Sequence, residues 1–178
     1  GKYLIFLNPD TKILEGNVKD LIDFSREREA RGEKIAVTGV KTINYDGTLQ
    51  YSARAFPSIS RQFFESFFLF KIFGKSKIFG SYFMTWWDHK DIKEVDWLSG
   101  SFMFLKKEIF EGINGFDEDY FMYSEDTDIC LRLKRKGYKN YYFPGYTIMH
   151  LDSAIASRDL LSRELGIGKS RRVYLKKI

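Results

Sequence analysis

Apolar residues in the N-terminal part of the chain alternate between short continuous runs and a helical pattern. Residues 3–7 form a continuous apolar run that ends at Asn8-Pro9-Asp10, and residues 34–40 form a second run. Between them, residues 17–31 repeat apolar positions at helical spacing. A continuous run of this kind is typical of a strand that is buried on both faces in a parallel sheet. The order strand, helix, strand predicts a βαβ unit with a right-handed crossover.

Turn signals divide the rest of the chain into further short elements. Asp46-Gly47 predicts a β-hairpin. Residues 95–105 predict a strand, or a bent strand pair broken at Gly100. A glycine inside such a run indicates a bulge or the close approach of a ligand to the backbone. Residues 138–150 predict two short strands separated by Pro144-Gly145.

A helix is predicted at residues 125–136, and it begins with a cluster of acidic side chains. Ser124 is its expected N-cap, and Gly137 is its C-terminal stop. At about 100° per residue, Asp126 lies in the middle of the apolar face, where a carboxylate is costly unless it is paired or used. Acids also favour a helix N-terminus through the macrodipole, which explains Glu125 well and Asp126 less well. Asp126 is therefore a candidate functional carboxylate.

An aromatic-rich stretch at residues 58–90 interrupts the regular pattern and is interpreted as an insertion. It interleaves phenylalanine, tyrosine and tryptophan with basic side chains. A basic, aromatic, amphipathic helix can lie in a membrane interface, but helix-spaced aromatic residues also form flaps packed on a core, or dimer contacts. Both interpretations stay open. The basic helical tail at residues 157–178 is typical of a solvated face and, less often, of a surface that binds anionic lipid.

Composition restricts the class of protein. The chain has 178 residues, of which 44% are hydrophobic, so a single domain over residues 1–178 is predicted. A net charge of +5 suits an anionic ligand or a membrane surface and does not require nucleic acid. The single cysteine, Cys130, excludes an internal disulfide framework and fits a reduced core residue. No apolar run approaches the ~20 residues of a spanning helix, and the start has no signal-peptide pattern.

Three chemically suited side chains lie at predicted element boundaries: Asp10 after the first strand, Asp126 at the start of the acidic helix, and His150 after the last strand. Open α/β sheets bind ligands at such strand ends. Aspartate and histidine are good ligands for Mg²⁺ or Mn²⁺, and such an ion would hold a diphosphate leaving group. A separate carboxylate would then take a proton from an attacking hydroxyl. Taken singly, Asp10 is an ordinary turn residue and His150 an ordinary structural histidine.

Five short motifs occur in order and are followed by Arg132, Gly137, Pro144 and His150: residues 7–11 (LNPDT), 46–50 (DGTLQ), 97–101 (WLSGS), 115–118 (GFDE) and 121–128 (FMYSEDTD). As a set they resemble family 2 glycosyltransferases, in particular the rhamnosyltransferase-like branch that builds bacterial surface polysaccharides. The resemblance implies an α/β fold of the GT-A type, with a mixed, mainly parallel sheet flanked by helices. It also implies an inverting, metal-dependent transfer of a sugar from a nucleotide-diphosphate donor to a saccharide or lipid-linked acceptor.

The resemblance also assigns roles to individual residues. Asp10 matches the last residue of the family's Asp-X-Asp metal motif, and His150 matches a histidine that completes the site for a divalent metal, Mg²⁺ or Mn²⁺. Asp126 matches the general base that deprotonates the acceptor hydroxyl, with Glu125 as the fallback. The expected substrate-binding residues are Asn8, which replaces the first aspartate of the metal motif, together with Trp97, Gly100, Ser101 and Glu125. For Trp97, plain strand packing is the alternative.

The chain departs from the family pattern at its N-terminus. Members begin with a βαβαβ half that holds the nucleotide, whereas this chain begins at the strand that carries Asn8-Pro9-Asp10. A domain truncated in this way would expose strand edges, so weak activity from the fragment alone and a homodimer are expected. Its expected place is the cytoplasm, peripheral to the inner face of the plasma membrane. The alternative is a non-catalytic binding or assembly module that keeps the scaffold without donor binding.

Overall fold

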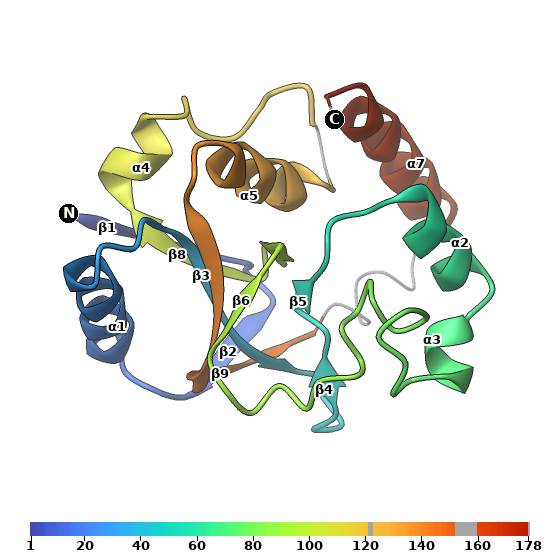
Figure 1. Cartoon of the computed structure of the whole chain (residues 1–178), viewed down its shortest axis with the longest axis horizontal. Helices are drawn as coiled ribbons and strands as arrows, with labels where there is room; N and C mark the ends of the chain where they lie inside the picture. The colour runs from blue at the N-terminus through green and yellow to red at the C-terminus, as the bar shows by residue number, and fades with distance from the viewer. Residues whose placement is uncertain (121–122, 152–159, 178) are drawn as a thin grey trace.

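The computed structural model describes residues 1–120, 123–151 and 160–177, which form an α/β structure (Figure 1). Its elements, in chain order, are β1 (Tyr3–Leu7), β2 (Thr11–Glu15), α1 (Val18–Ala30), β3 (Ile35–Ile43), β4 (Leu49–Gln50), β5 (Ala53–Arg54), α2 (Ile59–Ser66), α3 (Leu69–Ile72), β6 (Lys93–Val95), β7 (Trp97–Leu98), β8 (Phe102–Lys106), α4 (Lys107–Glu111), α5 (Glu125–Arg135), β9 (Lys139–His150) and α7 (Leu160–Lys177).

Most of the strands form one seven-stranded mixed sheet. Its central order is β1-β8-β3-β9-β2, with β4 beside β3 and β6 beside β9. Among the described strands only β3 and β9 pair in parallel, because every other pair in the sheet is antiparallel. The mixed sheet is therefore as predicted, but its mainly parallel character is wrong. Strands β1 and β3 do run in the same direction, but β8 lies between them and runs the opposite way.

Strand β1 is an edge strand and not a strand buried on both faces. It pairs with β8 from Tyr3 opposite Lys106 to Leu7 opposite Phe102. Ile5 and Leu7 are about two-fifths exposed, at 40% and 42%. The apolar run correctly predicted a strand, but a run of five residues does not reveal how many of its faces are covered.

Strand β9 is continuous where two short strands were predicted. Its register against β3 shifts between Val40, which lies opposite Phe143, and Lys41, which lies opposite Thr147. The extra residues of β9 in this irregularity include Pro144 and Gly145. Proline has no N–H to donate to a neighbouring strand. In a bulge the extra residue is left unpaired, so the strand can continue past Pro144.

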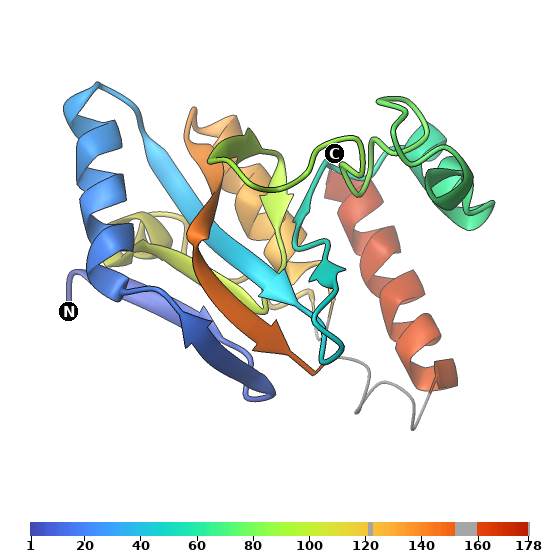
Figure 2. The same ribbon diagram turned by 90° about the horizontal axis from the view of Figure 1, so that it is seen from below.

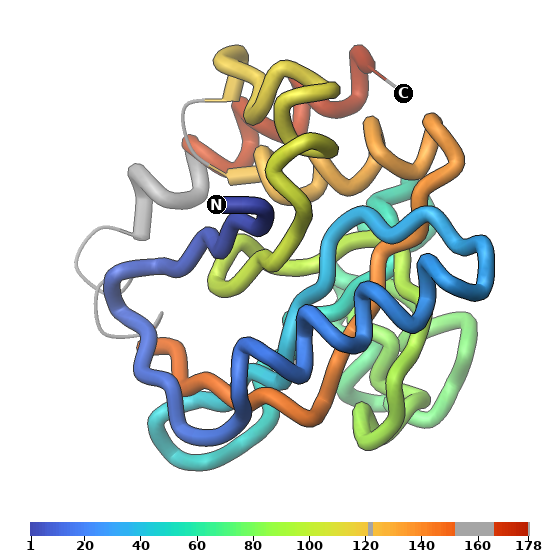
Figure 3. The backbone as a smooth tube through the Cα atoms, turned by 90° about the vertical axis from the view of Figure 1, so that its left-hand side faces the viewer, coloured from blue at the N-terminus to red at the C-terminus, as the bar shows by residue number. Residues whose placement is uncertain are grey.

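Helices cover both faces of the sheet, as Figures 1 and 3 show. On one face, Leu21 of α1 packs in a buried cluster with Phe102 and Phe104 of β8. On the other face, helix α5 contributes Ile129, Cys130 and Leu133 to the largest cluster, which also holds Met103 and Leu105 of β8. Strand β8 thus sends alternate side chains to the two faces. The burial of the free Cys130 agrees with its prediction as a core residue.

The aromatic segment forms α2, α3 and a series of turns. Helices α2 and α3 lie with α7 at the end of the molecule opposite α1 (Figures 1 and 2), whereas Trp87, near the end of the segment, packs against Tyr142 of β9 with ring centroids 5.1 Å apart. Helix α7 is held beside α2 by an ion pair between Arg171 and Glu65, with 3.3 Å between Nη2 and Oε2. The predicted tail is a single helix where the structure describes it, and residues 152–159 and 178 lie outside the described part.

Candidate active site

Asp10 and His150 meet where β9 ends. His150 is the last residue of β9 and is 7% exposed, and it pairs with Thr11 of β2. Its Nε2 atom lies 3.3 Å from Asp10 Oδ1 and also 3.3 Å from the amide nitrogen Nδ2 of Asn8. The Leu151 N–H donates to the carbonyl of Asp10 at 3.0 Å, which fixes the turn against the strand. The structure therefore brings His150 to Asn8 and Asp10, which lie about 140 residues away in the sequence.

Gln50 orients the imidazole of His150, and the sequence reasoning did not assign it a role. The Nδ1–H of His150 donates to Gln50 Oε1 at 2.8 Å. The β3–β4 hairpin places Gln50 there, and the amide of Gln50 donates in turn to Asn44 Oδ1 at 3.1 Å. A proton on Nδ1 leaves Nε2 as the accepting nitrogen, with the Asn8 amide and Asp10 Oδ1 each 3.3 Å away. The signal was present in the sequence, since Gln50 closes one of the family motifs.

This arrangement suits a divalent cation. Asp10 Oδ1 and His150 Nε2 lie 3.3 Å apart, and a proton or a cation shared by the two atoms would stabilise such a pair of acceptors. Among the described residues no group of three or more His, Cys, Asp or Glu side chains could hold a metal ion. Sites of this type combine one or two protein carboxylates with water and substrate phosphates, so an Asp–His pair fits the predicted Mg²⁺ or Mn²⁺.

The Asp126 carboxylate is fixed by backbone donors at the start of α5. Its Oδ2 accepts from the Gly100 N–H at 2.9 Å, and its Oδ1 accepts from the Thr127 N–H at 2.7 Å. Burial raises the pKa of Asp126 above its ordinary value, while these hydrogen bonds and the charge of Arg54 oppose the rise. A carboxylate with a raised pKa is a better proton acceptor. Arg54, on β5, was not predicted, because its approach depends on the pairing of β5 with β7.

The prediction of Ser124 as a side-chain N-cap is wrong. Ser124 has a left-handed backbone, with φ of 68°, and its side chain makes no capping hydrogen bond. Its carbonyl instead accepts from the Asp128 N–H at 2.8 Å. Tyr123 is also left-handed, with φ of 70°. An N-cap residue normally has an extended backbone, from which its hydroxyl reaches an N–H of the first turn. Residues 121 and 122 of the same motif lie outside the described part.

Backbone hydrogen bonds join the Asp10–His150 pair to Asp126. The Asn8 N–H donates to the carbonyl of Ser101 at 3.2 Å, and the preceding residue, Gly100, donates to Asp126. This link follows from the pairing of Leu7, the last residue of β1, with Phe102, the first residue of β8. The loop that carries Asp10 therefore adjoins the loop whose Gly100 binds Asp126.

Two buried polar atoms beside Asp126 have no hydrogen-bond partner among the described residues. They are Oε2 of Glu125 and Oγ of Ser101. Burial, followed by the neighbouring Asp126, raises the pKa of Glu125. A buried polar atom without a partner costs about 1–3 kcal/mol, and such atoms are expected where a polar ligand supplies the missing bond.

Trp97 occupies a packed position. It is 5% exposed, and its Nε1–H donates to the carbonyl of Ala55 at 2.9 Å. The guanidinium of Arg54 lies 5.0 Å from the centroid of its ring. The structure thus places Trp97 in strand packing and against Arg54, and its contact with substrate stays a prediction.

The fold and the match to a family model together define the class of protein. A mixed sheet flanked by helices is consistent with a GT-A-like glycosyltransferase domain. The chain belongs to glycosyl transferase family group 2, whose family model matches residues 36–165. The predicted family is thereby confirmed.

The chain is also similar to curated proteins that are named rhamnosyltransferases. The chain is 34% identical over 151 residues to Rhamnosyltransferase WbbL of Escherichia coli (strain K12), a match that covers 83% of this chain and 52% of that protein. It is 28% identical over 182 residues to the N-acetylglucosaminyl-diphospho-decaprenol L-rhamnosyltransferase of Mycobacterium tuberculosis (strain CDC 1551 / Oshkosh), covering 97% and 54%. The chain therefore spans about half the length of the curated relatives it matches. Among solved structures, the crystal structure of A197 from STIV has a TM-score of 0.48 at 14% identity, covering 84% of this chain and 58% of that one.

Proposed function

We propose that this chain is the catalytic, acceptor-side part of an inverting glycosyltransferase. It would transfer a sugar from a nucleotide-diphosphate donor to a saccharide or lipid-linked acceptor in bacterial surface polysaccharide synthesis. The observation that carries the proposal is the carboxylate of Asp126, held by the Gly100 and Thr127 N–H groups on the loop next to the Asp10–His150 pair. The names of both relatives describe rhamnosyl transfer, so a deoxyhexosyl group is the first donor sugar to test.

In this mechanism Asp126 acts as the general base. Its carboxylate accepts the proton of an acceptor hydroxyl while the hydroxyl oxygen forms a bond to the anomeric carbon of the donor sugar. The bond from that carbon to the diphosphate oxygen breaks on the opposite side, so the configuration inverts. The two N–H groups on Asp126 fix the direction of its lone pairs, and positioning of this kind accounts for much of a catalytic rate. Glu125 and Ser101 would bind the hydroxyl groups of the sugars through Oε2 and Oγ, which have no partner among the described residues.

Asp10 and His150 would hold the divalent ion, and Gln50 would keep the imidazole in the required tautomer. A bound ion would supply charge neutralisation at the diphosphate. The amide of Asn8, which lies beside the pair, would contact the donor.

Calorimetric titration tests this proposal. Nucleotide-diphosphate sugars are titrated into the protein with Mn²⁺ or Mg²⁺ and again with a chelator. We expect binding that requires the ion, and a loss of about tenfold or more in affinity for Asp10→Asn and for His150→Gln. Asp20→Asn removes an exposed carboxylate on α1 and should leave the affinity unchanged. If neither this chain nor any longer product of its gene binds a donor with either ion, the non-catalytic module is the better description.

A further inference from the structure

The surface of the aromatic segment carries most of the described large apolar side chains that are more than half exposed. In the part of the chain that the structure describes, eight such side chains are more than half exposed, and two of these, Ile13 and Tyr45, lie elsewhere. We call the other six, together with the exposed lysines among them, the aromatic platform; the six are Ile59, Phe63, Phe67, Phe68, Ile72 and Ile78. A cluster this dense on one segment marks an interaction surface.

The platform is the outer layer of a segment that has two layers. Ile59 and Phe63 of α2 and its C-cap residue Phe67 follow one another at intervals of four, and the Phe63 and Phe67 rings lie 4.7 Å apart. On the inner side Phe64 packs against Phe79, with ring centroids 5.1 Å apart, and Phe70 packs against Phe83 at 4.7 Å. The inner layer corresponds to a flap packed on the core, which was one of the interpretations left open by the sequence. The outer layer is not needed for that packing.

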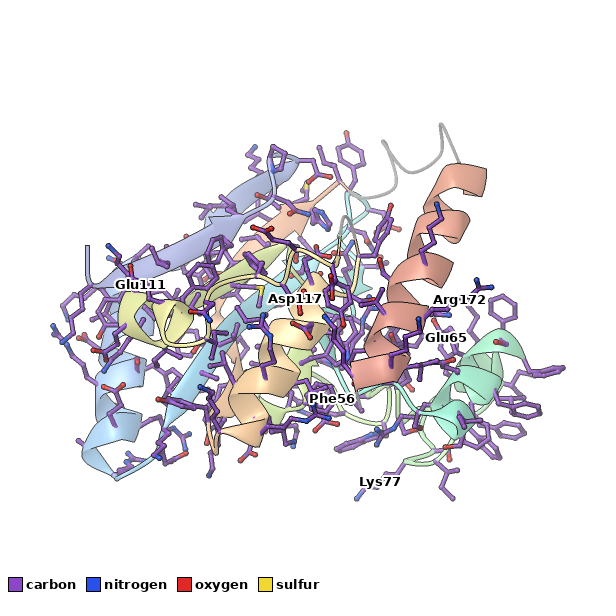
Figure 4. All side chains as sticks on the ribbon, turned by 90° about the horizontal axis from the view of Figure 1, so that it is seen from above. Phe56, Glu65, Lys77, Glu111, Asp117 and Arg172 are labelled. Carbon is purple, nitrogen blue, oxygen red and sulfur yellow. The ribbon has the colours of Figure 1, made fainter. Side chains whose placement is uncertain are left out.

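Positive charge accompanies the outer layer. Lys71, Lys75 and Lys77 are all exposed, and Lys71 Nζ lies 5.1 Å from the centroid of the Phe68 ring. The neighbouring α7 adds exposed Lys169, Arg172 and Lys176. Figure 4 shows Glu65 of α2 beside α7 and Arg172 projecting from α7 on the side where α2 lies.

The combination of positive charge and exposed aromatic groups favours a membrane surface over a protein as the partner. Lysine is depleted at protein–protein interfaces, whereas exposed aromatic residues with interleaved lysines are typical of segments that lie in the headgroup region of a membrane. Each such lysine is attracted by anionic lipid. No helix of the described residues is long and apolar enough to cross a bilayer.

We propose that the aromatic platform and the exposed basic face of α7 seat this protein on an anionic membrane surface. The consequence for catalysis rests on the proposed function. Strand β5 ends at Arg54, whose charge acts on Asp126, and α2 begins at Ile59. The guanidinium of Arg54 also lies 5.0 Å from the centroid of the Phe83 ring, in the inner layer of the aromatic segment. A membrane contact through the platform would therefore hold the candidate active site close to an acceptor carried by a lipid.

Vesicle flotation tests the proposal without any catalytic step. The purified chain is mixed with phosphatidylcholine vesicles, with or without phosphatidylglycerol. We expect binding only to the vesicles with phosphatidylglycerol, weakened by added salt. Phe63→Ser with Phe67→Ser should lower the partition coefficient about fivefold for each side chain and about 25-fold together, because each inserts roughly half of its surface. The matched control is Ile13→Ser with Leu14→Ser on β2, which removes apolar groups of similar exposure and should change nothing.

Three outcomes would overturn the proposal. The native chain does not float with anionic vesicles, or the Phe63/Phe67 variant floats as well as the native chain does. In the third, sedimentation shows that native copies associate through the platform without binding vesicles, and that the variant is monomeric. Circular dichroism of each variant checks that it is folded. Failure of donor binding in calorimetry would refute the proposed function and leave the flotation result standing, so the two proposals fail separately.

Discussion

Replacing Asp126 by asparagine separates its contribution to chemistry from its contribution to stability. The Gly100 and Thr127 N–H groups donate to different oxygens of this carboxylate, at 2.9 and 2.7 Å. Asparagine keeps only one acceptor oxygen, so one donor loses a charge-assisted hydrogen bond, which contributes about 1.5–3 kcal/mol. In return the variant no longer buries a charge. The net change in the free energy of unfolding should therefore stay within about 2 kcal/mol.

The pH dependence of this change has a definite sign. Burial raises the pKa of Asp126 in the folded state, so the folded protein favours the protonated carboxyl. Its contribution to stability is therefore present below the ordinary pKa and is lost as the pH rises through the raised pKa of the folded state. The stability of Asp126→Asn relative to the native protein should increase with pH over that interval and then become constant. Urea unfolding at a series of pH values measures this difference.

The effect on catalysis should be much larger. Loss of a general base lowers kcat by about 10²–10⁴-fold, and the acidic limb of the pH–rate profile should disappear with it. Glu125→Gln is the matched variant, because Glu125 is the adjacent carboxylate and burial also raises its pKa. We expect it to lose no more than about tenfold, since it would only bind substrate. Initial rates of sugar transfer decide between them. Full activity in Asp126→Asn, with a large loss in Glu125→Gln, would refute the assignment and make Glu125 the base.

Two further predictions concern the stability of the fold. Arg132→Met should lower the free energy of unfolding by about 3–5 kcal/mol, measured in urea. It removes the ion-pair partner of Asp128, which is 2% exposed and lies 2.6 Å from Arg132 Nε. The control Lys134→Met breaks a more exposed ion pair and should cost about 1 kcal/mol or less. Glu33→Gln should destabilise the protein at neutral pH. Hydrogen bonds, first from the Tyr141 hydroxyl, lower the pKa of Glu33 from 4.5 to about 2, so this stabilisation is lost as the pH falls through about 2, and a stability difference that stays constant down to that pH would contradict the assignment.

Local signals in the sequence were sufficient for the elements whose contacts are also local. The hairpin at Asp46-Gly47 formed with Gly47 at φ of 81°, and α5 ended before Gly137, also at φ of 81°. Both glycines adopt a backbone that other residues rarely take, so the residue type itself carried the information. The order of the sheet carried no such signal. The insertion of β8 between β1 and β3 depends on pairs that are distant in the sequence, such as Leu7 with Phe102 and Thr38 with Phe104, which no local pattern specifies.

The same distinction between local signals and distant contacts separates the site residues that were predicted from those that were missed. Asp10, Asp126 and His150 were named from the sequence because each lies where a strand or helix begins or ends. Arg54 was missed because its approach to Asp126 depends on the pairing of β5 with β7. Gln50 was missed as an individual residue because its bond to His150 joins positions a hundred residues apart.

The start of α5 violates the local rules for a stable helix at several consecutive positions. Tyr123 and Ser124 are both left-handed, at about 1–3 kcal/mol each, and the hydroxyl of Ser124 makes no cap. Burial raises the pKa values of the next two residues, Glu125 and Asp126, whose charges therefore oppose folding at neutral pH. A helix selected for stability alone would cap its first turn and expose its acids to water. These violations coincide with the bond from Gly100 to Asp126, one step from Ser101, the residue that binds Asn8. The left-handed residues, the missing cap and the buried acids are all found at the start of α5. Departures from local stability rules that gather at one place are expected at a site that binds a ligand.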